Sequence, residues 1–193
     1  ISVNKITSIK NWTYQYEFSN PNSNTTTFKN SDFVYLGNLG QASGLENFLI
    51  KIPIDWKFTI KIGGSGTEYE KLEKIIVKRK LINIELMQVK SNETESFLNS
   101  AKYALLVVNE NIKITSVPSK YLAYLKYNLP VLCVGNKNSI IADEILQNKT
   151  GYVCTTEELF SQKNLISKLD LNYDNYNFKN NNYKDKYLKI LCK

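Results

Sequence analysis

The chain contains no histidine among its 193 residues, and this absence removes several kinds of chemistry. Without an imidazole, these residues can form no Ser-His-Asp triad, no Cys-His pair, no His-ligated zinc site and no imidazole proton shuttle. An enzyme built on this chain must therefore act through other groups, or take its general base from outside these residues.

Cysteine and long apolar runs are also scarce. The three cysteines, Cys133, Cys154 and Cys192, lie far apart and form no CxxC motif. Cys133 and Cys154 fall inside apolar runs, so we expect buried free thiols in a reducing cytosol. No apolar run approaches the roughly 20 residues that cross a bilayer, and the first residues lack a signal-peptide pattern. We expect a cytoplasmic protein.

Arginine occurs only at Arg79, so lysine dominates the positive charge. The chain has 25 basic and 18 acidic residues, for a formal net charge of +7, and 24 of the basic residues are lysines. Proteins that read nucleic acids use arginine and cluster their charge, whereas these lysines are scattered. We therefore expect no nucleic-acid partner. The lysines form either a solvated surface or a basic face for lipid headgroups or phosphorylated ligands.

Short apolar runs alternate with helical patterns from about residue 32 onward. The expected strands are 33–36, 56–62, 82–87, 103–108, 129–134 and 151–154. The pattern predicts an α/β fold, a Rossmann-like, doubly wound parallel sheet of about six strands. We expect a linker and entry segment at 1–31, the Rossmann-like domain at 32–170, and a C-terminal loop and helix at 171–193. Capping boxes at 43–46 and 67–70 are expected to begin two helices.

The turns after the strands are informative, because ligands of an open parallel sheet bind at the carboxyl ends of its strands. The turn 37–40 has glycine at both ends, so a phosphate or sugar could approach its backbone closely. Neither this turn nor 63–66 matches GxGxxG or a Walker A motif. An NAD or nucleoside-triphosphate site is therefore not indicated.

The strongest candidate site is the start of the predicted helix 118–127. Its first turn offers free N–H groups, the hydroxyl of Ser119 and the ammonium group of Lys120. Hydrogen-bond donors, the positive end of a helix dipole and a point cation together suit a dianionic phosphate.

Several motifs occur in an order that resembles one enzyme family. Pro118-Ser119-Lys120, followed by Asn128-Leu129-Pro130-Val131-Leu132, is similar to a PSK…EYxAxGxPV segment. Lys10-Asn11-Trp12 is similar to an NW motif, 35–40 to YxGNLG, 62–66 to xGxG and 100–104 to xADxxL. These motifs, over about residues 5–170, resemble bacterial GT-B, family 4-type glycosyltransferases, most closely the O-antigen and polysaccharide branch.

The resemblance implies that this chain, which begins at Ile1, is the C-terminal, nucleotide-sugar-binding half of a two-domain enzyme. An acceptor-binding N-terminal domain would be its partner, and the fragment alone would be inactive. Lys120 would be the catalytic residue that stabilises the leaving group. The implied donor-binding residues are Asn38, Gly40, Gly63, Gln88, Thr115, Ser116, Ser119 and Lys120.

The implied activity is retaining transfer of a sugar from a UDP-sugar to a lipid-linked glycan at the membrane surface, in O-antigen or capsule synthesis. The implied location is therefore the cytoplasm, with peripheral contact at the inner membrane face. The sugar would be a hexose or an N-acetylhexosamine such as GalNAc. No metal and no cofactor are implied, since no Asp-x-Asp motif is present. The family's two glutamates are replaced by Thr115 and Ala123, so a ribose contact would need another group, such as Glu110.

Two other interpretations remain open. A GT-B-fold UDP-sugar epimerase is one, although such enzymes use histidine in this half and the chain has none. A non-catalytic basic module that binds anionic partners is the other, and it predicts binding that falls steeply with salt.

Overall fold

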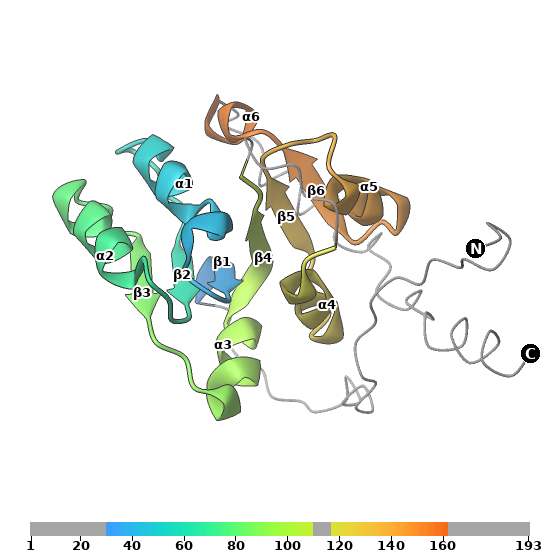
Figure 1. Cartoon of the computed structure of the whole chain (residues 1–193), viewed down its shortest axis with the longest axis horizontal. Coiled ribbons are helices and arrows are strands. Elements are labelled where there is room, and N and C mark those ends of the chain that lie inside the picture. Colours follow the sequence, from blue (N-terminus) through green and yellow to red (C-terminus); the bar gives the residue numbers. More distant parts are fainter. Residues whose placement is uncertain (1–29, 110–116, 162–193) are drawn as a thin grey trace, which may run out of the picture.

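The computed structural model describes residues 30–109 and 117–161, which form a parallel sheet with helices between its strands (Figure 1). The strands are β1 (Ser31–Leu36), β2 (Ile60–Gly63), β3 (Ile84–Met87), β4 (Ala101–Val107), β5 (Val131–Val134) and β6 (Gly151–Cys154). The α-helices are α1 (Leu45–Lys51), α2 (Tyr69–Lys78), α3 (Thr94–Asn99), α4 (Ser119–Lys126), α5 (Ile140–Gln147) and α6 (Thr156–Ser161).

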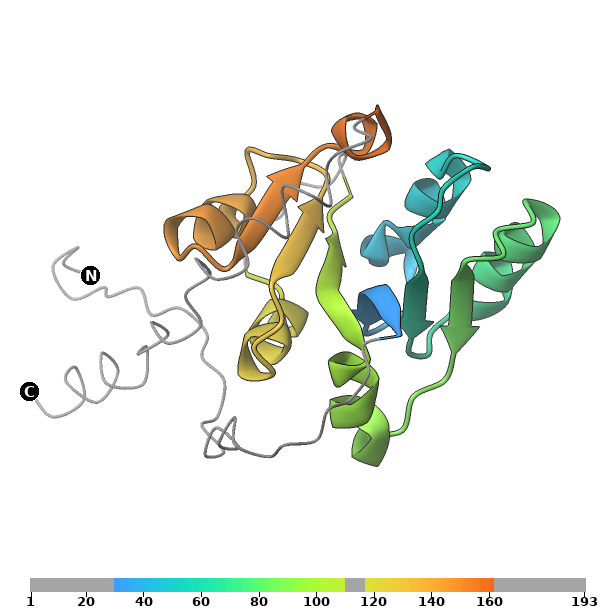
Figure 2. The same ribbon diagram turned by 180° about the vertical axis from the view of Figure 1, so that it is seen from behind.

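The six strands are all parallel and lie in the order β3-β2-β1-β4-β5-β6, seen from behind in Figure 2. This is the order of a doubly wound Rossmann-like sheet, and it confirms the predicted fold class. The chain runs outward from β1 to β3, then returns across the sheet to β4 and continues to the other edge. The strand order therefore reverses between β1 and β4.

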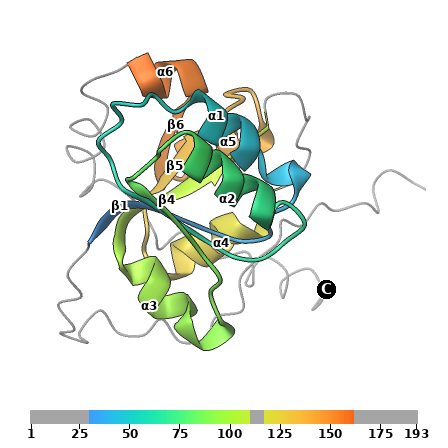
Figure 3. The ribbon, with the colours of Figure 1, turned by 90° about the vertical axis from the view of Figure 1, so that its left-hand side faces the viewer.

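Helices cover both faces of the sheet, and each face has its own buried cluster. Helices α1, α2 and α6 pack on one face and α3, α4 and α5 on the other. Figure 3 shows α1, α2 and α6 above the sheet, with α3 and α4 below it. Both faces are apolar because the strands are covered on both sides, as the continuous apolar runs predicted.

Three strands, β2, β3 and β5, begin later than predicted, because the start of each apolar run lies in a loop. β2 begins at Ile60, whereas the prediction was 56–62. Trp56 and Phe58 precede it in a loop, where their rings meet edge-to-face at 5.0 Å and Trp56 also contacts Phe160 of α6. Residue Ile82 is 91% exposed and precedes β3. These aromatic rings are thus partly buried from a loop, although their sequence pattern is that of a strand.

The two predicted capping boxes are wrong. A 3-10 helix at Gln41–Ser43 precedes α1, whose N-cap is Gly44 in the left-handed region (φ 71°). The Glu46 carboxylate pairs with Lys71 of α2 and does not bond back to the helix start. The N-cap of α2 is Glu68, which also makes no side-chain cap bond. A short local pattern did not predict these starts, because contacts between elements decide them.

Arg79, the only arginine, fixes the end of α1 to the end of α2. Its guanidinium donates to the carbonyls of Leu49 (2.6 Å) and Ile52 (2.8 Å) at the end of α1. Helix ends leave carbonyl groups without intrahelical partners, and a planar cation satisfies two of them at once.

Cys133 and Cys154 are buried free thiols, as predicted, whereas Cys192 lies outside the described residues. Among the helices of the described ranges, none has the length and apolar character needed to cross a bilayer.

Candidate functional site

The carboxyl ends of β1 and β4 mark the place where the strand order reverses. Crevices at such switch points are where open α/β sheets bind ligands. β1 ends at Leu36 and is followed by the loop 37–40, while β4 ends at Val107 and leads toward α4. Among the predicted site residues that the structure describes, Asn38 and Gly40 follow β1, Gly63 ends β2, and Gln88 follows β3. Ser119 and Lys120 begin α4.

The two glycine-containing loops at this edge are interlocked through their backbones. The Gly37 N–H donates to the Gly63 carbonyl (3.1 Å), and the Leu39 N–H donates to the Ser65 carbonyl (2.8 Å). Gly64, at φ +144°, packs so tightly that a Cβ there would lie 2.0 Å from the Gly37 carbonyl oxygen. The second loop therefore supports the first, and their glycines allow the backbones to touch.

Lys120 extends from the first turn of α4 to the loop that follows β1. Its Nζ lies 4.2 Å from the centre of the Tyr35 ring and donates to the Tyr35 hydroxyl. A Cβ placed on Gly37 would lie 3.5 Å from the same Nζ. The structure thus brings together the two segments that sequence patterns singled out separately, the glycine turn and the start of α4.

Burial determines the electrostatics of this contact. Partial burial lowers the pKa of Lys120 from 10.5 to about 8, because desolvation disfavours the charged amine. Burial likewise raises the pKa of Tyr35 to about 12, so its hydroxyl is neutral at pH 7 and donates to the Asn38 carbonyl (3.2 Å). No carboxylate of the described ranges forms a salt bridge with Lys120. An anionic ligand would supply the missing countercharge.

The first turn of α4 adds hydrogen-bond donors beside this cation. Pro118 is its N-cap residue and the exposed Ser119 its first residue. The first N–H groups of a helix have no intrahelical acceptor and carry partial positive charge. The predicted residues Thr115 and Ser116 immediately precede this turn and lie outside the described residues.

The other predicted residues lie around the same edge in different surroundings. Asn38 is exposed in the first loop, and Gly40 lies beside its side chain. Gly63 is buried at the end of β2, where a Cβ would meet the rings and methyls of Phe97 and Val89 within 2.7 Å. Gln88 is exposed after β3, the edge strand, and is separated from β1 by β2.

Two tyrosines at the site were not singled out by sequence patterns. Tyr35 is the buried partner of Lys120, and Tyr124 of α4 places its hydroxyl between β1 and β4. Both stand in apolar runs and resemble ordinary core residues in sequence. A signal was available for Tyr124, because it follows Lys120 by four residues and so shares its helix face.

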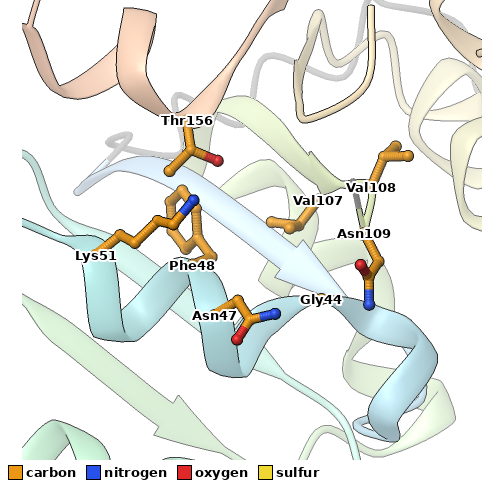
Figure 4. Close-up of a pocket in the computed structure, with 8 residues that line it drawn as sticks. All are labelled: Gly44, Asn47, Phe48, Lys51, Val107, Val108, Asn109 and Thr156. Carbon is orange, nitrogen blue, oxygen red and sulfur yellow. The ribbon is translucent and has the colours of Figure 1, made fainter. Parts of the chain in front are cut away.

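A pocket of about 240 Å³ opens on the other side of the same region, between α1, the end of β4 and the start of α6 (Figure 4). Asn47 and Lys51 of α1 and Asn109 after β4 line it. Lys51 is paired with Glu157 at 3.1 Å, so its charge is already compensated, in contrast to Lys120. Within the described ranges, no group of three or more His, Cys, Asp or Glu side chains is placed to hold a metal ion.

No protein-family profile and no curated protein sequence matches the chain. Solved structures do match its fold. The lipopolysaccharide outer core galactosyltransferase WaaB superposes with a TM-score of 0.61 at 14% identity, covering 100% of this chain and 57% of its own. The pneumococcal O-GlcNAc transferase GtfA, solved with UDP and GlcNAc, superposes with a TM-score of 0.59 at 16% identity, covering 86% of this chain and 36% of its own.

A third match shows which part of such enzymes is similar. The C-terminal domain of a group 1 family glycosyl transferase (LpcC) from Francisella tularensis gives a TM-score of 0.50 at 14% identity, and the match covers 79% of this chain and 83% of that domain. The chain spans about a third of the length of GtfA and just over half that of WaaB. The described part of the chain has the fold of the C-terminal domain of GT-B glycosyltransferases.

Proposed function

We propose that this chain is the UDP-sugar-binding part of a retaining glycosyltransferase. The observation that carries the proposal is the approach of Lys120, a cation without a described countercharge, to the glycine loop after β1. The match to GtfA, whose structure holds UDP, favours a uridine diphosphate donor over other anions. The match to WaaB favours a glycan acceptor of the lipopolysaccharide type.

In this proposal the diphosphate binds between the loop 37–40 and the first turn of α4. The bond from the sugar to the diphosphate breaks during transfer, and negative charge grows on the departing phosphate oxygen. Lys120 and the free N–H groups at the start of α4 stabilise that charge. The acceptor hydroxyl attacks from the side of the leaving group and passes its proton to the departing phosphate oxygen, so this chain needs no protein nucleophile.

The finer assignments belong to the same proposal. The transferred sugar is a hexose or an N-acetylhexosamine such as GalNAc, and the acceptor is a lipid-linked glycan at the membrane surface, in O-antigen or capsule synthesis. An N-terminal domain binds this acceptor, and activity requires both domains. In this proposal Asn38, Gly40 and Ser119, which are exposed or half-exposed, contact the diphosphate or the sugar.

Titration calorimetry of the 193-residue chain tests the proposal. We expect UDP and UDP-N-acetylhexosamines to bind, and GDP-mannose to bind at least about tenfold more weakly. Loss of all binding at millimolar UDP would overturn the donor-site assignment. Binding of nucleic acid or anionic vesicles that falls steeply with salt, without UDP binding, would favour the basic-module interpretation.

The affinity for UDP should depend on pH through Lys120. The pKa of its amine in the ligand-free domain is about 8, and only the protonated form attracts the diphosphate. Because the bound anion raises this pKa, protons are taken up on binding above pH 8. We therefore expect affinity to be constant from pH 7 to about pH 7.5 and to fall above pH 8, as measured by calorimetry at each pH. A flat profile from pH 7 to 9.5 would contradict the role of Lys120.

A further inference from the structure

The ladder between β1 and β4 stops before the two strands end. Their last paired residues are Val34 and Ala104, although β1 continues to Leu36 and β4 to Val107. Both ends remain paired on their outer sides, β1 with β2 through Leu36 and β4 with β5 through Val107. The sheet is therefore open only along this seam, at the switch point.

The backbone groups that face the seam can be identified from their neighbours. The Phe33 N–H donates to Thr59, directly before β2, and the Gly37 N–H donates to Gly63 of β2. The Leu36 N–H, which alternates with these, therefore faces β4. The N–H groups of Ala104 and Val108 donate toward β5, so Leu105 faces β1. A continued parallel ladder would join the Leu36 N–H to the Leu105 carbonyl.

The hydroxyl of Tyr124 occupies the position of that hydrogen bond. It accepts from the Leu36 N–H at 3.1 Å and lies 3.3 Å from the carbonyl oxygens of Leu36 and Leu105, to either of which it can donate. The side chain of Tyr124, a residue of α4, is fully buried. One side-chain hydroxyl thus replaces a direct strand-to-strand bond and keeps both backbone groups satisfied.

The same helix face holds Lys120, one turn before Tyr124. Lys120 reaches over the open seam to Tyr35 and Gly37 on β1 and its loop. We propose that Tyr124 is a positioning residue whose inserted hydroxyl keeps β1 and β4 apart and so sets the distance between Lys120 and the loop 37–40. The expected effect on UDP affinity rests on the proposed donor-binding function, whereas the expected effect on the position of Lys120 does not.

The test is Tyr124→Phe with Tyr121→Phe as its matched control. Tyr121 is also fully buried in α4, and its hydroxyl forms a 2.7 Å hydrogen bond with Thr150, away from the seam. Each variant removes one buried hydroxyl from the same helix, so their effects on general stability are comparable. Only Tyr124→Phe leaves the Leu36 N–H and the Leu105 carbonyl free to bond directly or to admit water.

The first readout is the pKa of Lys120 in the ligand-free chain, followed by ¹³C NMR of its Cε. If the seam closed, the Lys120 side chain would be displaced into solvent, and if water entered the seam, the amine would be hydrated where it lies. Either change removes part of the desolvation and so raises the pKa of Lys120 toward 10.5. We expect Tyr124→Phe to raise the pKa of Lys120 by about one unit and Tyr121→Phe to leave it unchanged. An unchanged pKa in Tyr124→Phe, or an equal rise in both variants, would overturn the positioning role.

The second readout is UDP affinity, which we expect to fall about tenfold or more in Tyr124→Phe and less than twofold in Tyr121→Phe. Equal losses in both variants would overturn the proposal. If the unmodified chain does not bind UDP, the proposed function fails, and the pKa of Lys120 still decides the role of Tyr124.

A measurement on the unmodified chain covers the case in which Tyr124→Phe does not fold. The Leu36 amide proton should be strongly protected from hydrogen exchange, because the buried Tyr124 hydroxyl accepts its bond. Exchange of this amide at the rate of an unprotected one would overturn the insertion.

Discussion

Replacement of Lys120 by methionine should weaken UDP binding about tenfold to a hundredfold while making the ligand-free domain more stable. The loss of affinity follows from removal of a charge-assisted contact with the diphosphate, which contributes about 1.5–3 kcal/mol. Titration calorimetry measures it, and in a full-length enzyme the same substitution should abolish transfer. Lys126→Met, at the far end of α4, is the control and should bind UDP normally.

The gain in stability has a separate cause. Lys120 is buried enough to lower the pKa of its amine from 10.5 to about 8, so at pH 7 its charged form is less favourable in the folded than in the unfolded chain. This cost lessens as the pH rises from 8 to 10.5, because the unfolded chain then binds more protons than the folded one. Methionine has a similar length and no charge, so we expect the free energy of unfolding at pH 7 to rise by about 1–2 kcal/mol.

The combination of opposite signs is diagnostic. If the lysine served only for packing or for solubility, its replacement by methionine would lower the stability of the domain or leave it unchanged. Denaturant unfolding and UDP titration of the same sample separate these cases. Lower stability together with unchanged affinity would show that Lys120 is a structural residue and would remove the main support for the donor site.

The sheet could be predicted from sequence because most of its strands lie in short, largely apolar runs bounded by turn residues. Strands β5 and β6 lie close to their expected positions for this reason. The start of β2 was misplaced, because Trp56 and Phe58 are apolar and aromatic yet pack from a loop. Residue type indicated burial correctly there, but it did not indicate the backbone conformation.

The candidate site could be predicted in parts and not as a whole. The glycines of the loop 37–40 and the Lys120 helix start have local chemical patterns that point to anion binding. Their meeting depends on β1 lying beside β4, and the Tyr124 contact with Leu36 joins residues 88 positions apart. No local pattern encodes such a contact. For Gly63 the sequence pattern suggested a ligand contact, but the close packing of Phe97 is enough to explain why the residue has no side chain.

Substitution of Gly64 by alanine should cost the domain about 3 kcal/mol or more of stability and abolish UDP binding. The new methyl group would lie 2.0 Å from the Gly37 carbonyl oxygen, at a φ of +144° that disfavours side chains. Because a backbone atom is the obstacle, the loop 37–40 itself would have to shift, which would change its position relative to Lys120. Chemical denaturation and UDP titration of Gly64→Ala measure the two losses.

Gly40→Ala separates the fold from the ligand in the same loops. Gly40 has an extended backbone (φ −109°), and the nearest atom to a Cβ there is Oδ1 of Asn38 at 3.7 Å. The free energy of unfolding should therefore change by less than about 0.5 kcal/mol. If the diphosphate or sugar packs against this glycine, as the donor-site proposal requires, the methyl group occupies its place and UDP-sugar affinity falls. Normal affinity in a stable Gly40→Ala protein would exclude Gly40 from the donor contact while leaving the role of Gly64 intact.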